Sequence, residues 1–563
     1  MRDKAGTFVG ARMGRPEKAK MRHLTGSPQV LFPVGDEGDR LRSFQAALEA
    51  GKIQSSFPFF YCESCKMEMI YRSCEECGKP CTQRYHCHFC SDLEKESCRH
   101  GKTFPYKKSG LDINYYFNKA KERLGERVHP DLIKGVRGTS NKNHVVEHLA
   151  KGILRSKHQI YVNKEGTTRY DCTELPITHF KPKEIGTTMA KLQELGYKKD
   201  IYGQDLTNDN QIIELKPQDL VLPGFNSLDE SAPQVLLRVA QFVDELLVKF
   251  YRLKPYYNLQ KEEDLVGHMV IGLAPHISAG LVGRIIGFSQ TQSLLAHPTY
   301  HAGLRRDCDG DEAAVMLLMD ALLNFSRQYL PNSRGSTMDA PLVLTAFLDP
   351  SEVDDQVHGL DVVWKYPLEF YQASLEMKNP WEVRYGAEQK KIEQLGDRLG
   401  TEKQYEGYGF THHVDNFNKG VQCSAYKILP SMEEKLFGQM EIAKKVRAVD
   451  MNDVAQLVIQ KHFLRDIKGN LRKFSMQQFR CIKCNDKYRR PPLINKCCQC
   501  GGRLVFTVTE GSVTKYLGLS LQLAEKYDFS PYIKQTLDLV KAQVEQVFGK
   551  EKDKQVGLGM FMT

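Results

Sequence analysis

The chain contains, at residues 267–276 and 280–288, the stretches GHMVIGLAPH and GLVGRIIGF, in which glycine alternates with apolar and β-branched residues. Glycine at this spacing disfavours a helix but permits short, strongly bent strands, which β-branched residues favour. The two stretches therefore predict curved strands of a compact barrel, and a fold with a β-sheet core.

An acidic loop follows them at residues 305–312, which read RRDCDGDE. Alternating aspartates around a glycine can converge on one point if the loop turns back on itself, and oxygen ligands at this density suit Mg²⁺. Arg305 and Arg306 favour a phosphate beside such a cation. This combination is what metal-assisted phosphoryl transfer needs.

Two simpler interpretations of the loop compete with a metal site. The aspartates could cap the helix that the sequence predicts over residues 313–330, although one would suffice. An EF-hand counted from Asp307 fails, because its sixth residue is Glu312 rather than glycine and its twelfth is Leu318 rather than glutamate. His297 and His301 precede the loop, and we expect both to be packed or hydrogen-bonded rather than ligands.

The net charge of the 563-residue chain is +10, from 79 Lys and Arg against 69 Asp and Glu. Residues 2–22 carry seven basic groups against two acidic ones, and residues 465–490 carry nine against two. The positive charge is therefore concentrated in two short windows, as on phosphate-binding surfaces, although solvated basic stretches would look the same.

Thirteen of the 16 cysteines fall in two clusters, and repeated Cys-x-x-Cys pairs are typical of zinc sites rather than of a single redox pair. Cys62, Cys65, Cys74 and Cys77 predict one closed four-thiolate site. Cys481, Cys484, Cys497 and Cys500 predict another, which leads into a strand at residues 504–509 and leaves Cys498 spare. Closed sites of this kind are structural.

A third zinc site involves Cys87 and Cys90. Its other half is either Cys98 with His100, which lie beyond an acidic spacer of ordinary length, or includes Cys81. We prefer Cys98 and His100. About three structural zinc ions are therefore expected.

The sequence predicts no membrane span and no secretion signal. The most apolar stretch, residues 266–288, is interrupted by histidines, an arginine and a proline, and Met1 is followed by charged residues. We therefore expect a cytoplasmic protein with reduced cysteines.

Taken together, the motifs resemble the C-terminal half of the large subunit of archaeal family D replicative DNA polymerases. The resemblance is carried by residues 10–20 (GARMGRPEKAK), 176–180, 214–219, 267–288, 309–311, 338–344, 366–371, 447–450 and the Cys481 ribbon with residues 489–492 (RRPP). It covers nearly the whole chain.

The resemblance implies an α+β multidomain fold, with two double-psi β-barrels as in multisubunit RNA polymerases, zinc-ribbon modules and a helical C-terminal region. It implies that Asp309 and Asp311 bind two catalytic Mg²⁺ ions. Asp307 stands where the family commonly has asparagine, and its metal role stays open. It also implies that the basic side chains of Arg12, Arg15, Lys18 and Lys20 lie near the primer end or the triphosphate. The expected DNA or substrate contacts are Arg12, Arg15, Arg305, Arg306, Arg489 and Arg490.

The final residues, 554–563, read KQVGLGMFMT and resemble the motif by which replication proteins bind a sliding clamp. In that motif Leu558, Phe561 and Met562 form an apolar plug, and Gln555 enters a side pocket. A charged stretch before such a tail lets it reach a partner. A frayed end with incidental apolar residues is the alternative.

The resemblance also implies the partners. These are primer-template DNA, deoxynucleotides, a small subunit with 3′–5′ exonuclease activity, and the sliding clamp. The family's large subunit is about twice this length, so we expect the first half to be a separately encoded chain or to be absent. Action at the nucleoid follows from the DNA substrate.

We expect six parts: the basic motif of a first barrel at 1–55, a paired zinc module at 56–105, the barrel core at 106–375, a helix-rich insertion at 376–470, a zinc ribbon at 471–510 and a helical end with the tail at 511–563.

DNA-templated DNA synthesis is the expected function. An RNA-synthesising two-barrel polymerase and a non-catalytic zinc-stabilised DNA-binding scaffold are the alternatives. Loss of Asp309 would abolish DNA synthesis or RNA synthesis but would leave a scaffold function unaffected.

Overall fold

A computed structural model describes residues 27–87, 89–94, 96–128, 130–224, 230–274, 277, 279–306, 310–332, 343–408, 416–419, 428–446, 449–482, 484 and 486–549. These residues divide into two compact units. The large unit takes in the described residues up to 371 and those from 380 to 419, and the helical unit takes in 372–379 and those from 428 onward.

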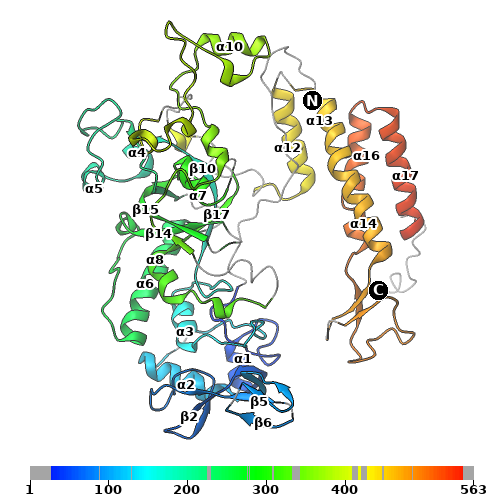
Figure 1. The fold of residues 1–563 in the computed structure, drawn as a ribbon. Coiled ribbons are helices and arrows are strands. Elements are labelled where there is room, and N and C mark those ends of the chain that lie inside the picture. Colours follow the sequence, from blue (N-terminus) through cyan, green and yellow to red (C-terminus); the bar gives the residue numbers. More distant parts are fainter. Residues whose placement is uncertain are drawn as a thin grey trace. The chain divides into compact units, whose positions relative to one another are not determined.

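A seven-stranded mixed sheet forms the centre of the large unit (Figure 1). Its strands, in spatial order, are β13 (Asp219–Pro223), β16 (Ser293–Ala296), β10 (Tyr170–Pro176), β17 (Glu312–Leu317), β14 (Met269–Leu273), β15 (Ala279–Ser289) and β18 (Val343–Thr345). Strand β13 pairs with β16 and also with β15, so the pairings of six strands return to their starting point. The strands predicted at residues 267–288 are therefore confirmed as β14 and β15.

Glycines in β14 and β15 allow neighbouring side chains to approach the strand backbone closely. A Cβ atom on Gly283 would lie 2.6 Å from Leu220 Cδ1, and one on Gly272 would lie 2.5 Å from the Tyr300 hydroxyl. Real Cβ atoms do not tolerate such distances. These two positions therefore require glycine because of packing.

The helix predicted over residues 313–330 is wrong. Residues Glu312–Leu317 form β17, and only α8 (Leu318–Asn324) and a 3₁₀ turn (Arg327–Tyr329) follow it. Every residue of β17 after Glu312 is buried, so the strand shows no alternation of polar and apolar residues. A short run buried on both faces cannot be told from a buried helix by its periodicity.

Helices pack around the sheet and build the main core. Helix α6 (Ala232–Glu245), continued by a π-helical turn (Leu246–Tyr251), packs against β10, β13 and β17. Helices α2 (Ile113–Leu124) and α3 (Leu149–Lys157) contact that turn. Helix α1 (Phe44–Ala50) leads into β1 (Lys52–Pro58), which pairs with β9 (Tyr106–Asp112). One continuous cluster of buried apolar residues joins these elements.

Seven short strands lie between β1 and β9 in the sequence and hold two of the cysteine clusters. They are β2 (Phe60–Cys62), β3 (Met67–Met69), β4 (Thr82–Gln83), β5 (Tyr85–Cys87), β6 (Ser91–Leu93), β7 (Ser97–Cys98) and β8 (Gly101–Lys102). With so little apolar core, such small hairpins need another source of stability.

A third group of elements surrounds a smaller core beside the sheet. It includes β11 (His179–Phe180), β12 (Ile213–Glu214), α4 (Pro182–Ile185) and α5 (Met189–Glu194). Helix α7 (Pro298–Gly303) connects β16 to the acidic loop. Helix α10 (Leu368–Leu375) spans the point where the chain passes from one unit to the other. The remaining short 3₁₀ turns of the large unit are Glu262–Leu265, Asp355–Gly359, Pro380–Glu382, Leu395–Arg398, Glu402–Gln404 and Phe417–Lys419.

The helical unit consists of helices, which enclose its own core, and a small ribbon (Figure 1). Its helices are α12 (Met432–Lys445), α13 (Met451–Val458), a π turn (Ile459–Phe463), α14 (Leu464–Met476), α15 (Glu510–Thr514), α16 (Leu517–Lys526) and α17 (Pro531–Phe548). The ribbon is the sheet of β19 (Phe479–Cys481), β20 (Lys487–Tyr488) and β21 (Leu504–Phe506), the last shorter than the strand predicted over 504–509. Among the described residues, no helix has the length and apolarity needed to cross a membrane.

Candidate catalytic loop and metal centres

The structure brings together the three cysteine-rich sets expected from the sequence. In each set, one ligand atom from every residue lies within 4.8 Å of the others. The sets are Cys62, Cys65, Cys74 and Cys77; Cys87, Cys90, Cys98 and His100; and Cys481, Cys484, Cys497 and Cys500.

Sulfur distances within these sets fit tetrahedral zinc. Zn–S bonds of about 2.3 Å place two ligand sulfurs roughly 3.8 Å apart. The Sγ–Sγ distance is 3.6 Å between Cys62 and Cys77 and 3.8 Å between Cys65 and Cys74. It is 3.4 Å between Cys87 and Cys98, and also within the pairs Cys481–Cys500 and Cys484–Cys497. A disulfide needs about 2.0 Å, so these are thiol clusters with the donor chemistry of structural zinc.

The middle cluster contains Cys98 and His100 rather than Cys81. His100 Nδ1 lies 2.9 Å from Cys90 Sγ. Cys81 instead packs against the first cluster, with its sulfur 3.9 Å from the carbonyl of Lys79. Cys498 is exposed, and its backbone N–H donates to the Tyr488 hydroxyl.

Of the acidic loop, the structure describes Arg305, Arg306 and residues 310–312, and Gly310 has a φ of +97°. Asp307 and Asp309 lie outside the described residues. Asp311 directly precedes β17, and its carboxylate accepts a 3.4 Å contact from Arg306 Nη1. Arg305 is exposed and adopts a φ of +59°, a left-handed conformation at the point where the chain leaves α7. The loop is thus anchored at both ends by regular elements.

A buried pair that sequence reasoning missed lies beside this loop. Glu174 on β10 and His301 on α7 are both fully buried, with Glu174 Oε2 3.2 Å from His301 Nδ1. Burial raises the pKa of Glu174, and His301 opposes that shift. Neither carboxylate oxygen of Glu174 has a hydrogen-bond partner among the described residues. A buried carboxylate so close to Asp311 adds negative charge beside the loop, which favours binding of a hard divalent cation such as Mg²⁺ there.

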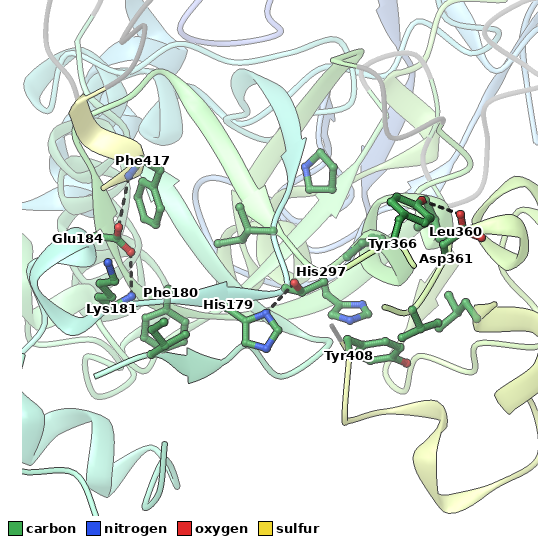
Figure 2. A pocket seen from close by; sticks show the side chains of 17 residues that line it. His179, Phe180, Lys181, Glu184, His297, Leu360, Asp361, Tyr366, Tyr408 and Phe417 are labelled. Atoms are coloured by element: carbon green, nitrogen blue, oxygen red, sulfur yellow. Dashed lines mark hydrogen bonds between the residues drawn. The ribbon is translucent and has the colours of Figure 1, made fainter. Parts of the chain in front are cut away.

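His297 caps α7, accepting from the backbone N–H of Thr299 at 3.2 Å. It also lines an apolar cavity of about 520 Å³, shown in Figure 2 with His179, Tyr366, Tyr408 and Phe417 around it. Burial lowers the pKa of His297 to about 3 and that of His179 to about 4, so both rings are neutral near pH 7. The carboxylate of Glu184 in this wall accepts backbone N–H groups of Lys181 and Phe417.

Only some of the basic residues that we expect to bind phosphate lie among the described residues. Arg489 and Arg490 are exposed in the turn after β20 of the ribbon. Arg12, Arg15, Lys18 and Lys20 lie outside the described residues, as do Gln555, Leu558, Phe561 and Met562 of the C-terminal tail.

Comparison with known proteins identifies the family. Residues 125–435, more than half of the chain, match the family described as DNA polymerase II large subunit DP2, catalytic domain. The chain belongs to the DNA polymerase II large subunit family. Residues 1–96 match the central domain of the same subunit, and residues 475–531, which contain the ribbon, match the zinc finger domain of DNA polymerase-epsilon.

Archaeal relatives of this family align along almost the whole chain. The DNA polymerase II large subunit of Archaeoglobus fulgidus is 48% identical over 100% of this chain and 49% of its own length. Those of Nanoarchaeum equitans and Pyrococcus furiosus are each 47% identical, over 98% and 97% of this chain and 48% and 43% of their own lengths. The chain spans about half the length of the curated relatives it matches.

Proposed function

We propose that the chain carries the nucleotidyl-transfer site of a DNA-templated DNA polymerase. One observation carries the proposal: the acidic loop and the buried Glu174 lie within the region that matches the family's catalytic domain. Asp309 and Asp311 hold two Mg²⁺ ions, with Asp307 as a further candidate ligand. Bound Mg²⁺ supplies Lewis-acid stabilisation of the transferring phosphate and lowers the pKa of the primer hydroxyl.

The chain's own cations orient the substrates. Arg306 already contacts Asp311, so its guanidinium is close enough to bind a phosphate beside the metal site. We assign Arg305, Arg12 and Arg15 to phosphate binding, and Lys18 and Lys20 to the charge that develops during transfer. Template base pairing supplies sequence selection, so contacts to the nucleic-acid backbone suffice.

The proposed framework is a double-psi β-barrel. The ring of six paired strands supports it, because a closed pairing order is what a barrel requires. The first barrel, to which residues 1–55 would contribute the basic motif, belongs to the same proposal, as does the six-part division of the chain given above.

Zinc in the three clusters is proposed as structural. The ligands are Cys62, Cys65, Cys74 and Cys77; Cys87, Cys90, Cys98 and His100; and Cys481, Cys484, Cys497 and Cys500. All are four-ligand sets, which leave no position for a substrate.

The partners follow from the family. We propose that the chain works on primer-template DNA at the nucleoid with a small exonuclease subunit and a sliding clamp that binds Gln555, Leu558, Phe561 and Met562. If the gene is split, a separately encoded N-terminal half is a further partner. Exposed Arg489 and Arg490 on the ribbon support a DNA-backbone contact by the helical unit.

Primer extension with Mg²⁺ and deoxynucleotides tests the proposal. The chain is assayed alone and with the small subunit and N-terminal half, beside Asp309→Ala, Asp311→Asn and the exposed control Asp349→Asn. We expect the reconstituted complex to extend the primer. Asp309→Ala and Asp311→Asn should abolish this extension, and Asp349→Asn should retain it. Extension that survives the loop variants, or none in any combination, would leave the zinc-stabilised DNA-binding scaffold; preference for ribonucleotides would indicate RNA synthesis.

A further inference from the structure

Glu174 on β10 lies opposite Asp311, the residue directly before β17. The antiparallel register of β10 and β17 pairs Thr173 with Glu312. The next step pairs Glu174 with Asp311, and the Glu174 backbone N–H donates to the Asp311 carbonyl at 3.0 Å. Residues opposite each other in an antiparallel pair project to the same face, with Cβ atoms about 5 Å apart. The two carboxylates therefore share one face at the edge of the acidic loop.

Two like charges so placed repel each other unless a cation compensates them. Their cationic neighbours are separate: Arg306 Nη1 is 3.4 Å from Asp311, and His301 Nδ1 is 3.2 Å from Glu174. The fully buried Glu174 carboxylate thus has the His301 ring as its ion-pair partner, but neither of its oxygens is in hydrogen-bond geometry with a donor in the described part of the chain. A buried carboxylate with so few polar contacts is costly, and proteins keep such groups where they act.

His301 holds this carboxylate in place from behind. Its Nε2 lies 3.1 Å from the carbonyl oxygen of Leu175, the residue after Glu174. One imidazole thus contacts the backbone of β10 through one nitrogen and the Glu174 side chain through the other. Outer partners of this kind orient metal-binding carboxylates and tune their affinity.

We propose that Glu174, supported by His301, is a positioning residue that strengthens divalent-cation binding at Asp311. The inference rests on the proposed function, since it takes the acidic loop to be the metal site. It adds two residues from β10 and α7 to a site that the sequence confines to residues 307–311. Removal of the Glu174 charge therefore weakens cation binding without removing a ligand.

Mn²⁺ titration of the zinc-loaded full chain, followed by the electron paramagnetic resonance signal of free Mn²⁺, tests this without DNA. We expect Glu174→Gln to weaken Mn²⁺ affinity about 10-fold, as loss of an outer partner does. Glu184→Gln is the matched control, because it neutralises another buried carboxylate of the large unit, one that accepts the backbone N–H groups of Lys181 and Phe417. It should leave the affinity unchanged.

A double-mutant cycle separates positioning from general damage to the fold. If Glu174 acts through the cation at Asp311, Glu174→Gln has no further effect on Mn²⁺ affinity in the Asp311→Asn background. Higher Mg²⁺ should also restore primer extension by Glu174→Gln in the reconstituted complex. Wild-type affinity in Glu174→Gln, or equal weakening with and without Asp311, overturns the inference.

The two proposals fail in different ways. Mn²⁺ binding that depends on Asp311 and Glu174, without primer extension by the wild type, removes the polymerase function and leaves the metal-site inference standing. Extension that depends on Asp311 but is indifferent to Glu174 at every Mg²⁺ concentration leaves the function and removes the inference.

Discussion

Arg155 and Glu147 form an ion pair from which solvent is wholly excluded: Arg155 Nη2 lies 2.8 Å from Glu147 Oε1, and neither side chain is exposed. The guanidinium also donates to the carbonyls of Gln29 and Gly166. Glu147 accepts the backbone N–H of Leu31. The pair therefore ties α3 to two separate segments of the large unit.

Because both members of this pair are buried, removal of one charge leaves the other buried without its ion-pair partner. Glu147→Gln should lower the free energy of unfolding of the large unit by about 3–5 kcal/mol, measured by urea denaturation. Asp36→Asn is the control, since Asp36 pairs with Arg137 at the surface, with side chains 96% and 65% exposed. It should change stability by less than about 1 kcal/mol. Similar losses in both variants would contradict this view of the buried pair.

The zinc content of single-residue variants should show that each of the three four-ligand sets binds one zinc ion. The purified full chain is expected to hold about three zinc ions, and serine at Cys65, Cys90 or Cys484 should each remove one. Released zinc is measured with a colorimetric chelator after denaturation. Cys81→Ser and Cys498→Ser should keep full zinc content, because neither residue belongs to one of the three four-ligand sets. Loss of zinc from Cys81→Ser would show that this thiol is a ligand.

Acid should destabilise the large unit partly through His297. Burial lowers the pKa of His297 to about 3 in the folded chain, from an ordinary value of 6.5. Between these two values the unfolded chain binds a proton that the folded chain does not, so stability falls as the pH drops below about 6.5. Between about pH 7 and about pH 5, the melting temperature of His297→Gln should therefore fall less than that of the wild type. An identical pH dependence in both proteins would refute the prediction.

Duplex DNA binding by the full chain should show two phosphate contacts in the ribbon. If exposed Arg489 and Arg490 each contact a phosphate, Arg→Ala at either position should flatten the slope of log affinity against log salt by about 0.9. Fluorescence anisotropy at several salt concentrations measures the slope. The control is Lys534→Ala, an exposed lysine on α17. A slope unchanged by either arginine variant would remove the ribbon from the DNA surface.

Features set by short stretches of chain could be predicted from the amino-acid sequence alone. Cys-x-x-Cys knuckles place two thiolates on one tight turn, so spacing alone grouped the eight ligands of the two four-cysteine sites. For the third site spacing only favoured Cys98 and His100 over Cys81, and the structure brings Cys98 and His100 to Cys87 and Cys90. The glycine and β-branched pattern of residues 267–288 predicted β14 and β15, because strand curvature and close backbone approach impose glycine locally.

Features that depend on contacts between distant segments came only from the tertiary structure. β17 was mistaken for a helix because burial on both faces, by neighbours far along the chain, removes the polar-apolar alternation of a strand. The sequence predicted that His301 is packed or hydrogen-bonded, which the structure confirms, but not that it pairs with Glu174. Strand pairing sets Glu174 opposite Asp311. Sequence by itself determined which thiols lie together in the two four-cysteine sets and where along the chain the acidic loop lies. Only the fold decided which distant charges meet there, since register and burial are properties of the assembled sheet.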